Sequence, residues 1–230
     1  MKFLLTSAGI KNASIHGALV ELLGKPVAES DALCIPTALY AHPWAGPRQA
    51  WRFVSGQEPR SPMTGLGWRS LGLLELTALP SLDEERWVPL VQEADVLLVD
   101  GGDAAYLCHW MRASGLADLL PSLRETVWVG VSAGSMVLTP RVGADFVTWH
   151  SPAGDSTLGV VDFSIYPHLD NPDLPENTMA AAERWAAGLS GSAYAIDDET
   201  AIKVVDGAVE VVSEGRWKLF SPKSQASKSA

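Results

Sequence analysis

The chain has 230 residues, of which 47% are hydrophobic and 19% charged, with a formal net charge of −10 and a pI near 4.9. It is long enough to bury one substantial core, and its acidic balance argues against nucleic acid or an anionic membrane as a partner, because both need a basic face. We therefore expect one domain over residues 1–220 that acts on small or peptide substrates. Whether the chain forms a homo-oligomer is left open.

We expect no signal peptide and no membrane span in this sequence. The apolar run within residues 1–9 is too short for a signal peptide, and no other run reaches the length of a membrane span. Residues 221–230 hold no large apolar side chain, which predicts a mobile tail. Cys34 and Cys108 lie in apolar segments without paired spacing, a pattern typical of buried thiols in a reducing compartment. The expected location is the cytoplasm.

Short apolar runs alternate with helix-like segments along the first part of the chain. The runs are 3–5, 32–35, 71–76, 96–99 and 127–131. Continuous hydrophobicity is typical of strands covered on both faces in a parallel sheet. The segments between them with apolar residues at helical spacing are 15–23, 84–93 and 106–120. The pattern predicts βαβ units and an α/β fold with three layers, in which helices cover both faces of a mostly parallel sheet.

The pattern changes in the second part of the chain. Closely spaced strand-like runs occur at 163–166, 194–196, 201–205, 209–212 and 217–220. Asp206 and Gly207 separate two of these runs and both tolerate a positive φ, so they predict a hairpin turn and a late antiparallel meander. The Gly- and Pro-rich segment 41–67 is the least regular part and is expected to hold a helix near 48–53 within a long loop.

A candidate nucleophile lies in residues 126–138, where a buried strand runs into Gly130-Val-Ser-Ala-Gly134 and then into an apolar helix. This is the pattern of a nucleophile elbow, in which a serine occupies a sharp turn between strand and helix and flanking glycines avoid collisions with the backbone. Ser132 is therefore expected at the carboxyl end of its strand, near the positive end of the next helix.

A serine nucleophile needs a base, and His168 is the histidine of the five with the most suitable context. It ends the strand-like run 163–168, so it too lies at a strand's carboxyl end, where ligands bind in open α/β sheets. His16 and His109 fall in expected helices, His42 in the irregular loop and His150 in a polar connection. We expect no catalytic role for these four.

The third member should be a carboxylate that orients the imidazole. Asp145 is our first choice, because it lies between Ser132 and His168 in the chain and follows a glycine. Asp170 and Glu199 are the alternatives. Each of the three could equally be a solvated turn or cap carboxylate.

An oxyanion site is predicted where the strand-like run 96–99 meets Asp100-Gly-Gly-Asp103. The N–H groups of Gly102 and Ala133 could bind the oxyanion, with Gly101 and Asp103 bordering the substrate. The alternative is that the two glycines only form a tight turn and that Asp103 caps the following helix. There is no HExxH, CxxC or GxxxxGK[ST] pattern, so we expect no metal and no cofactor.

Taken in order, these motifs resemble the peptidase E family, the S51 serine peptidases. The matching segments are 4–9, 35–38, 99–103, 130–135, 166–168 and 196–201, and the resemblance covers essentially residues 1–220. The resemblance implies a fold similar to the class I glutamine amidotransferases, with serine in place of their cysteine, and hydrolysis of dipeptides or short peptides with an amino-terminal aspartate. It also implies catalytic roles for Ser132 and His168 and an oxyanion site at Gly102.

Two departures bear on specificity. The family usually has Gly-Gly-Asn where this chain has Asp103, and aspartate-specific members carry an arginine at a position that Arg184 does not match. An unpaired substrate carboxylate in a closed site is costly, so we expect little preference for Asp-X peptides unless Arg48, Arg52 or Arg184 folds over the site.

Three other functions compete with a peptidase. A cyanophycinase-like hydrolase would act on an acidic polymer, and a binding module could keep the amidotransferase-like shape without turnover. An α/β-hydrolase esterase shares the elbow, but the short stretch between Ser132 and His168 leaves little room for that fold's later elements.

Overall fold

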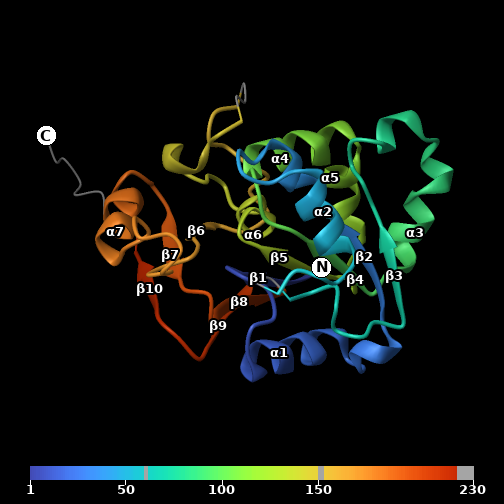
Figure 1. The fold of residues 1–230 in the computed structure, drawn as a ribbon, viewed down its shortest axis with the longest axis horizontal. Helices are drawn as coiled ribbons and strands as arrows, with labels where there is room; N and C mark the ends of the chain where they lie inside the picture. The colour runs from blue at the N-terminus through green and yellow to red at the C-terminus, as the bar shows by residue number, and fades with distance from the viewer. Residues whose placement is uncertain (60–61, 150–152, 222–230) are drawn as a thin grey trace, which may run out of the picture.

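The computed structural model describes residues 1–59, 62–149 and 153–221. Within them, seven strands form the main sheet in the order β3-β2-β4-β5-β1-β8-β9 (Figure 1). The first five strands in this order are parallel to one another. β8 is antiparallel to β1, and β9 is antiparallel to β8. The strands are β1 (Lys2–Thr6), β2 (Asp31–Ile35), β3 (Ser70–Leu73), β4 (Val96–Val99), β5 (Val127–Val131), β8 (Thr200–Val205) and β9 (Ala208–Ser213).

Helices cover both faces of this sheet. They are α1 (Ala13–Leu23), α2 (Pro47–Val54), α3 (Val88–Glu93), α4 (Ala104–Ala113), α5 (Leu116–Leu119) and α6 (Ala133–Met136). Short 3₁₀ turns join them: η1 (Val27–Glu29), η2 (Thr37–Ala41), η3 (Leu79–Ser81), η4 (Glu84–Arg86), η5 (Leu120–Ser122) and η6 (Ala144–Phe146). Side chains alternate along β1, so Leu4 packs with the buried residues of α1 and α2, whereas Phe3 and Leu5 pack with those of α3 to α6. The predicted three-layer α/β fold is therefore confirmed.

A second, three-stranded sheet has the order β10-β7-β6 and stands at one end of the molecule with α7 (Figure 1). Its elements are β6 (Phe163–Tyr166), α7 (Met179–Ala187), β7 (Ser192–Ile196) and β10 (Trp217–Phe220). β6 and β7 are parallel and β10 is antiparallel to β7. The five late strands are thus divided between two sheets. The β8–β9 hairpin is antiparallel, as expected, and lies on the main sheet, whereas β6 and β7 pair in parallel on the small sheet.

The turn between β8 and β9 has the predicted chemistry. Asp206 and Gly207 have φ values of 50° and 80°, which a two-residue hairpin with a left-handed turn requires. Two predicted helices are interrupted. The segment 84–93 divides into η4 and α3, and the segment 106–120 divides into α4 and α5 at Gly115, whose φ is 82°. Helical spacing alone does not reveal these breaks.

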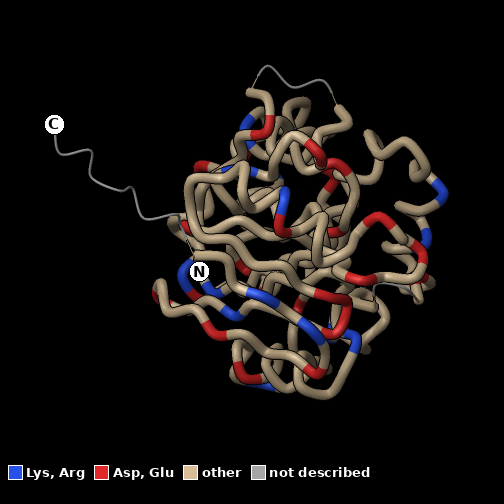
Figure 2. The backbone as a smooth tube through the Cα atoms, turned by 90° about the vertical axis from the view of Figure 1, so that its left-hand side faces the viewer, with Lys and Arg blue, Asp and Glu red and all other residues tan. Residues whose placement is uncertain are grey.

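Acidic and basic segments lie interspersed on the side of the molecule shown in Figure 2. No helix in the described part of the chain is long and apolar enough to cross a membrane. Except for Ser221, the tail predicted over 221–230 lies outside the described residues, and so does His150.

Candidate active site

Ser132 occupies the sharp turn between β5 and α6, with φ 46° and ψ −108°. The neighbouring glycines are needed because backbone packs closely on both sides. A Cβ on Gly130 would lie 2.4 Å from the carbonyl oxygen of Gly134, and one on Gly134 would lie 2.3 Å from that of Val99. A non-glycine residue in this conformation is strained, and surrounding structure must hold it in place. Ser132 therefore lies in a strained turn between strand and helix, the backbone geometry that a nucleophile elbow has.

His168 follows β6 and also has a positive φ, 57°. Its Nδ1 lies 2.7 Å from Oδ1 of Asp198, and Oδ2 of Asp198 accepts a hydrogen bond of 2.6 Å from the side-chain amide of Asn171. The His168 side chain is 21% exposed, so one edge of the ring reaches solvent. The carboxylate can only accept, which puts the imidazole proton on Nδ1 and leaves Nε2 able to act as a base.

Neighbouring groups stabilise the ionised form of the Asp198 carboxyl. Burial alone would raise the pKa of its carboxyl, but the hydrogen bonds from His168 and Asn171 and the nearby charge of Lys11 outweigh burial and lower the pKa. Asp198 is therefore ionised at neutral pH and can stabilise a protonated His168.

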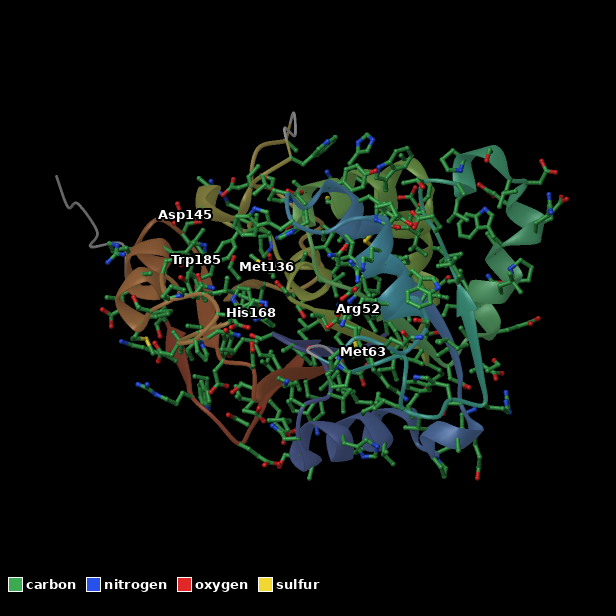
Figure 3. All side chains as sticks on the ribbon, in the orientation of Figure 1. Arg52, Met63, Met136, Asp145, His168 and Trp185 are labelled. Carbon is green, nitrogen blue, oxygen red and sulfur yellow. The ribbon has the colours of Figure 1, made fainter. Side chains whose placement is uncertain are left out.

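The backbones of Ser132 and His168 are anchored to consecutive residues at the carboxyl end of β1. The N–H of Ser132 donates to the carbonyl of Thr6 at 2.9 Å, and the N–H of His168 donates to Oγ of Ser7 at 3.0 Å. Ser7 in turn donates to the carbonyl of Ile196, the last residue of β7. In Figure 3 His168 lies between the small sheet with α7 and the main body of the molecule. The main sheet and the small sheet thus meet at the site.

The carboxylate on His168 is not one of the three we predicted. Asp145 is exposed on η6, Asp170 pairs with Arg216 at 2.8 Å, and Glu199 accepts a hydrogen bond from Asn12 at 3.0 Å. Chain order is a poor guide here, because the relevant neighbour comes from sheet pairing.

β6 and β7 are parallel, with Tyr166 opposite Ala195, so the residues that follow the two strands emerge side by side. His168 follows one strand and Asp198 the other. The run of three acidic residues 197–199 is the signal in the sequence, and its middle residue, Asp198, contacts His168 instead of the predicted alternative Glu199.

The predicted oxyanion turn lies next to Ser132. Gly102 has φ 132°, and a Cβ on it would lie 2.2 Å from the carbonyl oxygen of Ala38. A Cβ on Gly101 would lie 3.5 Å from Cβ of Ser132. Only glycine fits at Gly102, and the turn brings backbone amides near Ser132. Ala133 begins α6, where N–H groups have no partner within the helix.

Asp103 does not fit the predicted role in substrate binding. It is 1% exposed, caps α4 through the N–H of Tyr106 at 2.7 Å, and accepts the N–H groups of Thr148 and Trp149 at 3.1 and 2.7 Å. The hydroxyl of Thr148 donates to the same oxygen. Its carboxylate is therefore satisfied by the protein, so the alternative interpretation as a helix cap is correct.

Asp103→Ala should lower the free energy of unfolding by about 1–3 kcal/mol, because it removes the cap of α4 and the shared acceptor of the N–H groups of Thr148 and Trp149. Urea unfolding measures this loss. Asp118→Ala, an exposed carboxylate on α5, is the control and should cost less than about 0.5 kcal/mol. Equal losses in the two variants would contradict the role of Asp103 as an anchor.

Asp100 is a buried carboxyl beside the oxyanion turn, 5% exposed, and accepts the N–H of Gly101 at 2.8 Å. Burial raises the pKa of Asp100 to about 7. The hydrogen bond from Gly101 lowers this pKa, and the charge of Glu58 raises it further. Since this value exceeds the ordinary 3.8 of the unfolded chain, the unfolded chain ionises first, and stability falls as the pH rises from about 4 to about 7.

Asp100→Asn keeps an acceptor for Gly101 and removes the ionisation. The variant should be more stable than the wild type at pH 8, by about 2 kcal/mol, with a smaller difference at pH 4. Urea unfolding of both proteins at the two pH values checks this, with Asp118→Asn as the exposed control. A difference that does not change with pH would mean that Asp100 does not titrate in this range.

Three of the remaining histidines lie in the described residues: His16 on α1, His109 on α4 and His42 just after η2. Burial lowers the pKa of His42, and the charge of Asp103 opposes this shift. Across the described residues, no group of three or more His, Cys, Asp and Glu side chains is arranged to hold a metal ion.

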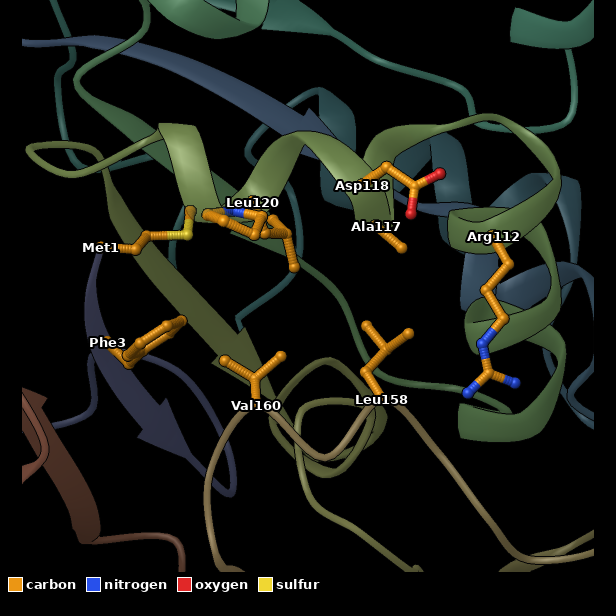
Figure 4. A pocket seen from close by; sticks show the side chains of 9 residues that line it. Met1, Phe3, Arg112, Ala117, Asp118, Leu120, Leu158 and Val160 are labelled. Atoms are coloured by element: carbon orange, nitrogen blue, oxygen red, sulfur yellow. The ribbon is translucent and has the colours of Figure 1, made fainter.

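Two clefts lie outside this site. One, of about 540 Å³, is lined by Met1 at the start of β1 and hence lies at the opposite end of the strands from Ser132 (Figure 4). The other, of about 620 Å³, is lined by residues that include Asp145 and Arg184. Neither lining includes Ser132 or His168.

Comparisons with known proteins agree with this fold. The family model "Peptidase family S51" matches residues 3–212. A protein named Peptidase E from Nostoc sp. strain PCC 7120 is 24% identical over 139 residues, and this match covers 57% of the chain and only 57% of the relative's length. A solved structure of a peptidase from an acI-B1 Actinobacterium has a TM-score of 0.68 at 19% identity, covering 96% of this chain and 94% of that one. A candidate peptidase E from Listeria monocytogenes EGD-e has a TM-score of 0.63 at 18% identity, covering 93% and 98%.

Proposed function

The chain belongs to peptidase family S51, and from this we propose that it is a serine peptidase that hydrolyses dipeptides or short peptides through an acyl-enzyme. Ser132 is the nucleophile and His168 the base. Asp198 is a positioning residue for His168, and the N–H groups of Gly102 and Ala133 bind the oxyanion.

The reaction follows from the position of the imidazole proton. Nδ1 of His168 donates to Asp198, so Nε2 takes the proton of Ser132 as Oγ attacks the peptide carbonyl. The same nitrogen then protonates the leaving amine. Water, deprotonated by His168, hydrolyses the acyl-enzyme and restores the serine hydroxyl.

One observation carries this proposal. Ser132 and His168 both have a positive φ, and their backbone N–H groups donate hydrogen bonds to the neighbouring residues Thr6 and Ser7. In addition, Nδ1 of His168 contacts the ionised carboxylate of Asp198. A binding module without turnover would not require a strained serine and an oriented imidazole at the same point.

The proposal is tested with a panel of X-Ala dipeptides and Asp-X dipeptides, with products identified by mass. We expect cleavage of several X-Ala peptides and little preference for Asp-X. Arg52, whose Nε lies 4.0 Å from Glu58, and Arg48 stay candidates for receiving a substrate carboxylate. Products from a poly-aspartate chain but from none of the dipeptides would instead favour a cyanophycinase-like hydrolase, and an absence of all products would contradict a peptidase.

A further inference from the structure

Aromatic side chains from three separate segments gather beside the oxyanion turn. The segments are the 3₁₀ turn and loop after β2, the first turns of α4, and the connection after α6, which Figure 1 shows together along one edge of the molecule. We call this group the aromatic rim, and its members are Tyr40, Trp44, Tyr106, Trp110 and Trp149.

The inner part of the rim is a set of packed rings. The ring centre of Tyr106 lies 5.4 Å from that of Trp149 and 6.1 Å from that of Trp110, both edge to face. His109 lies 5.2 Å from each of the two tryptophans. Such contacts hold large rings in fixed orientations.

The outer part of the rim faces solvent. Tyr40 is 43% exposed and Trp44 is 80% exposed, with the ring of His42 against Trp44 at 5.9 Å. η2, which carries Tyr40, packs against α4, which carries Tyr106. Exposed tyrosine and tryptophan in one patch are typical of binding surfaces.

The rim is fixed to the oxyanion turn on both sides. Ala38, two residues before Tyr40, contacts Gly102 through its carbonyl, which also accepts the N–H of Asp103 at 3.0 Å. The carboxylate of Asp103 holds the N–H of Trp149. Asp103 thus positions the rim relative to the proposed oxyanion site, although it does not itself face substrate.

We infer that the rim binds an aromatic or large apolar side chain of the residue on the amino-terminal side of the scissile bond. This rests on the proposed function. The leaving nitrogen must face His168, so the residue that carries this nitrogen lies on the His168 side of the site, and the acyl residue is the one that can lie on the other side. The rim belongs to the Gly102 side of the site, whereas the small sheet with α7 borders the His168 side (Figure 1).

The test compares kcat/KM for Phe-Ala, Ala-Phe and Ala-Ala. In the wild type, Phe-Ala should exceed Ala-Ala by about tenfold or more, the range that burial of an apolar side chain supplies. Trp44→Ala should lower kcat/KM for Phe-Ala by about tenfold and leave Ala-Ala within about twofold. Tyr40→Ala should act in the same direction. The control is Trp217→Ala, which removes a 44% exposed tryptophan from β10 and should change neither substrate.

The outcomes separate the two claims. If the wild type cleaves dipeptides but prefers Ala-Phe, or if Trp44→Ala lowers Phe-Ala and Ala-Ala equally, the inference is wrong and the peptidase stands. If the wild type releases no product from any dipeptide, the proposed function fails and the inference fails with it. Trp44 is too exposed for its loss to prevent folding, and a melting curve checks this.

Discussion

Ser132→Ala is expected to lower kcat for dipeptide hydrolysis by about 10⁴–10⁶-fold, because the variant lacks the only atom that attacks the carbonyl. The fold should not change, since the hydrogen bond from this residue to Thr6 uses the backbone N–H. The measurement is product release under substrate saturation, together with urea unfolding of both proteins.

Ser135→Ala is the matched control from the same elbow. The Ser135 hydroxyl is buried and lies 2.8 Å from the carbonyl of Thr6 and 2.9 Å from that of Gly130. Its loss should reduce stability by about 1–2 kcal/mol and leave the turnover of folded protein near that of the wild type. Near-normal turnover in Ser132→Ala would overturn the mechanism.

Asp198→Asn should lower kcat by about 10⁴-fold, because the asparagine amide can hold the imidazole in the wrong tautomer and offers no charge to the imidazolium. His168→Gln should be comparably inactive. Asp145→Asn is the control, and its activity should remain within about twofold of the wild type, since Asp145 lines a different cleft. Activity measured from pH 5 to 9 separates a lost base from a lost fold.

A large loss of kcat in Asp145→Asn together with a small loss in Asp198→Asn would contradict the role of Asp198 as the residue that orients His168. Glu199→Gln distinguishes Asp198 from its neighbour, because Glu199 bonds Asn12 rather than the imidazole. We expect this variant to affect stability more than turnover.

Most of the main sheet could be predicted from local pattern. The runs 96–99 and 127–131 match β4 and β5 residue for residue, because strands covered on both faces must be apolar throughout. The elbow could also be predicted, since a serine between a buried strand and an apolar helix, flanked by glycines, has few other uses. These features depend on neighbours in the chain.

The carboxylate and the role of Asp103 depend on neighbours in space. Asp198 meets His168 only because β6 pairs in parallel with β7, and nothing local to residues 197–199 reveals that pairing. The Asp103 carboxylate accepts a hydrogen bond from Thr148, which lies more than forty residues later in the chain. Asp103 replaces the asparagine that is usual in the family, which suggests a change in substrate binding. In the structure, however, the Asp103 carboxylate binds backbone N–H groups of the protein.

The central claim is that His168 activates Ser132 as a nucleophile, and labelling with a fluorophosphonate tests it most directly. Intact mass and peptide mapping of the wild type should show one phosphonyl adduct, on Ser132, and the adduct should form far more slowly in His168→Gln and Asp198→Asn. Peptide hydrolysis should fall in proportion to labelling. An adduct on another residue, or hydrolysis that continues after Ser132 is fully labelled, would contradict the account.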